Sequence, residues 1–71
     1  MNISVKKLKE GMKVYIAHSK GKMLIIRYDS KTDKYVLAEN KTNNILYSYS
    51  KLSLLIGTTN HIFNLQDVAI D

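Results

Sequence analysis

With 71 residues and no cysteine, the chain predicts a single domain over residues 1–71 and excludes both a disulfide framework and a thiolate zinc site. No segment approaches the roughly 20 apolar residues that cross a bilayer, and residues 1–7 lack the apolar run of a signal peptide, so we expect a cytoplasmic protein with no membrane partner. The formal net charge of +5 favours an anionic partner.

The first segment, which ends at Gly11, allows two interpretations. In one, Ser4 caps a short helix, Ile3 and Leu8 form a hydrophobic staple, and Gly11 ends the helix in the left-handed conformation. In the other, Ile3 and Val5 alternate as a short strand that a turn then ends. Because a helix of under about two turns persists only when it packs against other elements, the sequence leaves both interpretations open.

Residues 12–17 predict a strand with one buried face. The apolar side chains at even positions, including Val14 and Ile16, alternate with those of Lys13 and Tyr15. Since successive side chains of a strand point to opposite faces, we expect Tyr15 on the outer side together with Lys13.

Turn-forming residues separate the strands that follow. Turns are expected over residues 18–21, 29–33 and 40–44, where Gly, Asn and Asp tolerate positive φ angles. Residues 23–28 and 35–38 are the strands between these turns. The first of these two strands begins with apolar residues on both of its faces, so we expect it to bend and to contribute to two sides of a closed barrel.

The next segment changes phase. Apolar residues occupy odd positions from Ile45 to Tyr49 and even positions from Leu52 to Ile56. A regular strand cannot change face without an extra residue. We therefore predict that Ile45, Tyr47 and Tyr49 share one face of a strand, with the two tyrosines in the core. A bulge or a 3₁₀ turn is expected around Ser50 to Leu52, and a new strand is expected to start near Ser53.

The last part of the chain begins with another expected turn, over residues 57–60. Residues 62–70 then contain no lysine or arginine. They close the sheet as a further strand, or they form a helical turn with Asn64 as its N-cap and Asp67 in its first turn. In either case Phe63 is expected to fill the core.

Together these elements predict an all-β domain: a small five-stranded barrel or meander with a 3₁₀ turn and, under the helical interpretations, one short terminal helix. The arrangement of Leu8–Ile16, a glycine-containing hairpin, Ile26–Asp29, Lys34–Leu37 and a 3₁₀-like break resembles the SH3-like small β-barrels. The resemblance covers most of the chain.

A narrower resemblance is to the bacterial Sm-like RNA-binding proteins. In that family a short N-terminal helix precedes five strands, and an aromatic-Asp pair ends the second strand, as Tyr28 and Asp29 do here. Residues 45–49 look like the fourth strand of that family. The resemblance implies a domain that binds RNA.

Positive charge is concentrated at the start of the chain. Residues 1–27 hold seven basic residues and one acid, whereas the remainder holds four lysines and five acids. This asymmetry indicates a face for nucleic acid, in which an exposed tyrosine stacks on bases and the cations meet phosphates, although a solvated lysine-rich face gives the same pattern. The candidate nucleic-acid-binding residues are Lys6, Lys7, Lys9, Lys13, Tyr15, Lys20, Lys22 and Arg27.

Catalytic patterns are absent from the sequence. His18 and His61 lack the spacing of a zinc site, and Asp29 and Asp33 bracket a turn in which both are expected for turn chemistry. No nucleophile has a nearby base, and no glycine-rich loop precedes a helix. We therefore expect a protein that is not an enzyme and that needs no cofactor or metal.

The sequence thus predicts a non-enzymatic small binding module whose basic N-terminal face contacts nucleic acid. The alternative is a protein-interaction module, such as a small phage or mobile-element accessory or inhibitor protein, that binds an acidic protein surface or pairs through an edge strand. A homo-oligomer is a third interpretation, because the apolar residues on both faces of residues 23–26 exceed what one small core absorbs.

Overall fold

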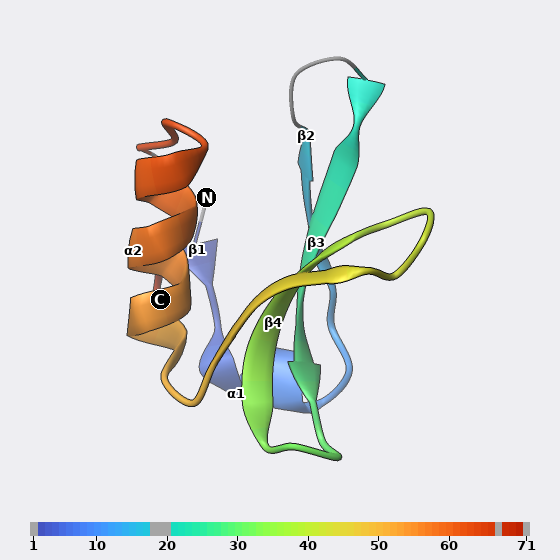
Figure 1. Ribbon diagram of the computed structural model, residues 1–71. Coiled ribbons are helices and arrows are strands. Elements are labelled where there is room, and N and C mark those ends of the chain that lie inside the picture. The colour runs from blue at the N-terminus through green and yellow to red at the C-terminus, as the bar shows by residue number, and fades with distance from the viewer. Residues whose placement is uncertain (1, 18–20, 67, 71) are drawn as a thin grey trace.

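A computed structural model describes residues 2–17, 21–66 and 68–70. These residues form six strands and two helices (Figure 1). Their bounds are β1 Asn2–Ile3, α1 Val5–Lys9, β2 Val14–Ala17, β3 Met23–Asp29, β4 Lys34–Glu39, β5 Ile45–Tyr49, α2 Leu52–Ile62 and β6 Ala69–Ile70. No helix in the described ranges is long and apolar enough to cross a membrane.

The fold is mainly strand, as predicted, but its strands form two separate sheets. Strands β2, β3, β4 and β5 make an antiparallel meander in chain order, and β1 pairs with β6 in parallel. The predicted closed five-stranded barrel is therefore not formed by the described residues. The four-stranded sheet stays open, and α2 lies along one side of it (Figure 1).

The segment that ends at Gly11 forms the helix of the first interpretation, α1, after the two-residue strand β1; Val5, which the strand interpretation needed, begins the helix. The Ser4 side chain caps the helix by accepting a hydrogen bond from the Lys7 N–H at 3.4 Å. At the other end, the N–H groups of Gly11 and Met12 donate to the carbonyls of Leu8 and Lys7, both at 3.0 Å. This is a Schellman ending, and it requires the positive φ of +107° that Gly11 adopts.

Two of the predicted turns are confirmed by the backbone conformation of residues within them. Asp33 has a φ of 54° in the turn after β3, and Asn43 has a φ of 56° in the turn after β4. Both residue types tolerate this region because their short polar side chains bond locally. Of the predicted turn at 18–21, Gly21 has a φ of 73°, while residues 18–20 lie outside the described ranges.

The phase change was predicted at the end of β5, but it occurs inside the strand. Leu37 pairs with Tyr47 but Ala38 pairs with Ile45, so Leu46 is an extra residue in the ladder. A bulge of this kind moves the residues beyond it to the other face of the sheet. Ile45 therefore does not share the face of Tyr47 and Tyr49, contrary to the prediction, and its side chain is exposed. Tyr47 is partly buried against the core, as expected.

Helix α2 begins where a bulge or a 3₁₀ turn was predicted, and it replaces the strand that was to start near Ser53 and the turn at 57–60. The even-numbered apolar residues suggested a period of two, but burial in the structure follows the helical spacing i, i+3, i+4, i+7. The residues of α2 that are buried are Leu52, Leu55, Ile56 and Thr59.

The chain after α2 forms neither the long strand nor the helical turn that was predicted. Asn64 has a φ of 55°, which is not the extended conformation of an N-cap, and the strand alternative survives only as the two-residue β6. The Asn60 side-chain amide ties this segment to the helix by donating to the Val68 carbonyl at 2.9 Å. Phe63 is partly buried against the core, and Asp67 lies outside the described residues.

The main core lies on one face of the four-stranded sheet, which we call the core face. The predicted burial of Val14 and Ile16 and the predicted exposure of Tyr15 are confirmed. Ile3 and Leu8 are both buried in this cluster, as expected of the hydrophobic staple. The buried cluster consists of Ile3, Leu8, Val14, Ile16, Leu24, Ile26, Tyr35, Leu37, Leu52, Leu55, Ile56 and Val68.

The opposite side of the sheet, which we call the second face, is formed by the alternate residues of the same strands. Ile25, Val36 and Ala38 are buried there but do not belong to the main core cluster. Because these residues alternate with core residues along β3 and β4, their burial explains why β3 is apolar on both of its faces. The second face therefore has an apolar floor of its own.

Candidate nucleic-acid interface

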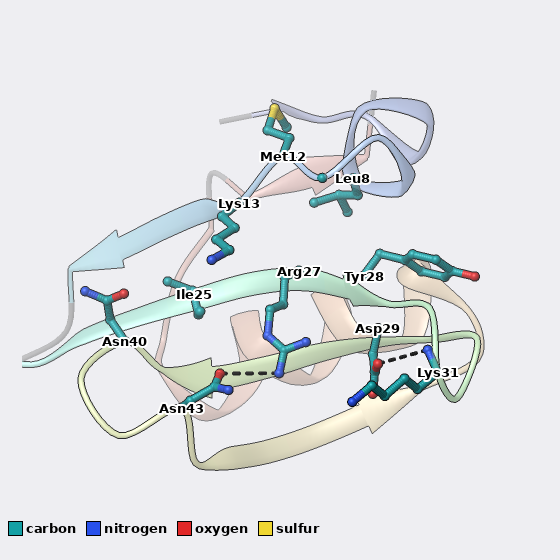
Figure 2. A pocket seen from close by; sticks show the side chains of 11 residues that line it. Leu8, Met12, Lys13, Ile25, Arg27, Tyr28, Asp29, Lys31, Asn40 and Asn43 are labelled. Carbon is teal, nitrogen blue, oxygen red and sulfur yellow. Dashed lines mark hydrogen bonds between the residues drawn. The ribbon is translucent and has the colours of Figure 1, made fainter.

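A hollow of about 570 Å³, which we call the basic hollow, opens over the second face. Figure 2 shows it between the loop that precedes β2, strand β3 and the turn that joins β4 to β5. Its apolar lining includes Leu8, Met12 and Ile25. The polar side chains that line it are Lys13, Arg27, Asp29, Lys31, Asn40 and Asn43.

Three cations reach this hollow from three different parts of the chain. Lys13 directly precedes β2, Arg27 belongs to β3, and Lys31 lies in the turn between β3 and β4. In Figure 2 the side chains of Lys13 and Arg27 extend from neighbouring strands on the same side of the sheet. The sequence separates Lys13 from Lys31 by a whole hairpin, and the fold brings them to one surface.

Arg27 is oriented by the turn between β4 and β5. Its Nη2 donates a hydrogen bond to the Asn43 side-chain carbonyl at 3.3 Å. The positive φ of Asn43 belongs to the same turn, so the local turn chemistry positions the acceptor. A guanidinium has five N–H donors, and the bond to Asn43 leaves others for an anion.

Asp29 is the carboxylate among the described residues that line the basic hollow. Its two side-chain oxygens accept hydrogen bonds from the Lys31 N–H and from the Thr32 hydroxyl, both at 3.1 Å. These bonds are the turn chemistry that the sequence predicted for Asp29. With three cations and one carboxylate, the lining of the hollow is positively charged.

The end of β3 beside the hollow is held by Tyr28. The Tyr28 hydroxyl donates a hydrogen bond to the Asp33 carboxylate, and this bond raises the pKa of Tyr28, with smaller contributions from desolvation and from the negative charge of Asp33. The Lys9 Nζ lies 5.7 Å from the centroid of the Tyr28 ring. The Tyr35 ring lies 5.4 Å from the same ring. These contacts fix one wall of the hollow.

A second, smaller hollow of about 300 Å³, which we call the turn hollow, lies beside the turns at the other end of β3. Lys22 and Lys41 line it together with Glu39 and the side chain of Met23. Asn40 lines both hollows, so the two are neighbours on the protein surface. Cations therefore lie toward both ends of the second face.

The structure brings together some of the predicted site residues and separates others. Lys13 and Arg27 line the basic hollow, Lys22 lines the turn hollow, and Lys9 contacts the ring of Tyr28, which lines the basic hollow. Tyr15 is exposed on the second face. Two further candidates, Lys6 and Lys7, are exposed on α1 and line neither hollow. Lys20 lies outside the described residues.

Sequence reasoning missed the contribution of the chain beyond residue 27. Lys31, Lys41 and Asn43 line the two hollows, but all three lie beyond residue 27, where the net charge of the sequence is negative. A signal for them existed in the turns themselves. The turns on either side of β3 and β4 alternate between the two ends of the meander, so Lys41 lies at the same end as Lys22, and Lys31 lies at the end where the loop before β2 carries Lys13.

No protein-family model, curated protein or solved structure matches this chain. Within the described ranges, no three His, Cys, Asp or Glu side chains come together as a metal-binding group. The geometry and the charge of the second face are therefore the features of this chain that bear on its function.

Proposed function

We propose that the protein is a non-enzymatic module that binds nucleic acid through its second face. The observation that carries this proposal is the convergence of Lys13, Arg27 and Lys31, from three parts of the chain, on one hollow that holds a single carboxylate in its described lining. Clustered cations attract the closely spaced phosphates of a nucleic acid and release its condensed counterions. Hydrogen bonds from side-chain amides and a guanidinium then position the backbone.

The residues beside these cations suit a phosphate backbone. Arg27 retains free N–H donors, and guanidinium groups bind phosphate through two parallel hydrogen bonds. Asn40 and Asn43 add amide donors at the same surface. Their contacts with phosphate oxygens provide affinity without sequence selection.

Within this proposal the four-stranded meander is a relative of the SH3-like barrels in which α2 takes the place of the 3₁₀ turn. The likeness to Sm-like proteins rests on Tyr28 and Asp29 at the end of β3 and on β5 as the last strand of the meander. Both likenesses favour a binding domain, and a fold likeness by itself does not define an activity. We place the protein in the cytoplasm.

The test is a titration of labelled single-stranded and double-stranded oligonucleotides by fluorescence anisotropy at several salt concentrations. We expect binding at about 50 mM salt that weakens steeply as the salt concentration rises, because each phosphate contact releases a counterion. Changing Lys13, Arg27 or Lys31 to alanine should each reduce the salt slope by about one unit.

The matched control is the double change of Lys6 and Lys7 to alanine. Both lysines are exposed on α1 and line neither hollow, so their removal lowers the net charge without touching the second face. The proposal is wrong if no binding occurs at low salt. It is also wrong if the double change reduces binding as much as a double change of Lys13 and Lys31.

The alternative function, a protein-interaction module, is favoured by the free edge of β2. In the described four-stranded sheet β2 is an edge strand that pairs only with β3, and an edge strand offers backbone hydrogen bonds to a partner's strand. The basic hollow would then face an acidic protein surface. Capture of one defined protein from cell extract that nuclease treatment does not release would favour this alternative.

A further inference from the structure

Three exposed apolar side chains gather on the second face. Tyr15 is 51% exposed, Met23 is 40% exposed and Ile45 is 46% exposed, on β2, β3 and β5 respectively. Solvent-facing apolar residues that occur singly need no explanation, but these three share one side of one sheet. Their common location favours a ligand that has apolar parts.

The strand register connects two of these side chains through the apolar floor. Tyr15 pairs with Ile25, Ile25 pairs with Ala38, and Ala38 pairs with Ile45. The four residues form one row across all four strands, which spans about 14 Å at the usual strand spacing. The buried pair in the middle supports the exposed residues at the two ends.

Cations flank this apolar row on both sides. One step along the strands in one direction are Lys13 and Arg27, in the basic hollow. In the other direction Met23 leads to Lys22 and Lys41, in the turn hollow. Along the strand direction the second face thus has cations, then the apolar row, then two further lysines beside Glu39.

We infer that the ligand of the second face is a single-stranded nucleic acid whose bases lie on the apolar row while its phosphates lie in the two hollows. The inference rests on the proposed function and specifies its substrate class. A duplex presents phosphates on its outside and keeps the faces of its bases stacked inside, so it would leave the apolar row without a partner. A single strand presents both charged and flat apolar surfaces, and aromatic side chains stack on its bases.

The experiment compares four labelled probes of one length: single-stranded DNA, single-stranded RNA, the matching DNA duplex and an abasic DNA strand. The abasic strand carries the phosphates without the bases. We expect the two base-containing single strands to bind more tightly than the duplex and the abasic strand. Tyr15→Ala should weaken their binding roughly 5-fold to 150-fold, the range of one lost stacking contact, and should leave abasic binding unchanged.

Two control variants accompany Tyr15→Ala. Tyr15→Phe keeps the ring and should bind as the unchanged protein does. Leu54→Ala removes an exposed apolar side chain of similar exposure, 53%, from helix α2 and should have no effect on binding. If Tyr15→Ala fails to fold, an upfield shift of the Tyr15 ring protons of the unchanged protein on adding single strand replaces it as the readout.

The outcomes separate the inference from the function on which it rests. Salt-dependent binding that is equal for single strand, duplex and abasic strand, with no effect of Tyr15→Ala, would overturn the single-strand inference and leave the nucleic-acid module standing. Absence of binding to every probe at low salt would overturn both. Selective single-strand binding that Tyr15→Ala weakens by the expected factor, with unchanged circular dichroism, is the supporting result.

Discussion

The two faces of the four-stranded sheet are built from the same strands but have different chemistry. Along β3, Leu24 and Ile26 face the main core, whereas Ile25 and Arg27 face the second side. The core face is packed against α2 and holds the main buried cluster, whereas the second face has a buried floor with charged and aromatic side chains around it. Because successive side chains of a strand point to opposite faces, one set of residues stabilises the fold and the other set is available for binding.

The largest expected effect lies on the core face. Leu37→Ala should lower the free energy of unfolding by about 2–5 kcal/mol, because it leaves a cavity beside a fully buried position in a domain of marginal size. Urea denaturation followed by circular dichroism measures the change. Met23→Ala on the second face is the control, with a change within about 0.5 kcal/mol. Similar losses at the two positions would break the comparison between the faces.

The loop between α1 and β2 serves both faces, so a change there should affect both properties. Gly11→Ala should lower the free energy of unfolding by about 1–3 kcal/mol, because only glycine adopts the φ of +107° without strain. Gly11 also lines the basic hollow, so oligonucleotide binding should weaken at temperatures where the variant remains folded. Normal stability with a normal salt slope would contradict the role assigned to this turn.

A substitution in helix α2 should raise the free energy of unfolding, and it lies on the core side of the sheet alone. Gly57→Ala should raise the free energy of unfolding by about 0.5–1 kcal/mol, since alanine favours the helix and an added Cβ meets no atom within 4 Å. The binding of oligonucleotides should not change, because α2 lies on the other side of the sheet from the hollows. The measurement pairs thermal unfolding with the anisotropy titration. A loss of stability would show that the helix interior is misassigned.

The smallest effect concerns the contact between Tyr28 and Asp33. The hydrogen bond raises the pKa of Tyr28 above its ordinary value of 10.0, so the neutral phenol is favoured in the folded state. Its contribution to stability is present below that ordinary value and is lost as the pH rises through the raised pKa. Tyrosinate absorbance against pH should show one tyrosine that titrates late, and Asp33→Asn should move it back. Unchanged titration would contradict the contact.

The sequence predicted the first half of the fold well, because local rules decide that half. The Ser4 cap, the left-handed Gly11 and the alternation around Tyr15 each depend on neighbours within a few residues. The position of Asn43 in a left-handed turn conformation follows from the same local chemistry.

The second half was misread where two periodicities compete. Leu52, Leu54 and Ile56 fit a strand, whereas Leu52, Leu55 and Ile56 fit a helix, and the packing of α2 against β4 and β5 favours the helical set. The bulge at Leu46 could not be predicted either, because it depends on the partner strand and not on the residues of β5 alone.

The candidate site was predictable in part, for a related reason. Lys13, Tyr15 and Arg27 were identified because strand alternation and local charge place them. Lys31 and Lys41 were missed because charge was counted along the chain. The pairing of the strands in the meander brings these two lysines close to the basic residues of segment 1–27. Surface charge is assembled by topology, so the sum over a sequence segment does not describe it.

The pairing of β1 with β6 has a consequence for the order of folding. Asn2 pairs with Ala69 and Ile3 with Ile70, so this ladder closes a loop of nearly the whole chain, the contact with the greatest entropy cost. The meander between them consists of successive hairpins and forms from neighbouring segments. During synthesis the hairpins can pair as they emerge, while β1 has no strand to pair with until residue 70 has left the ribosomal tunnel. We therefore expect the docking of the first strand to be the last step of folding.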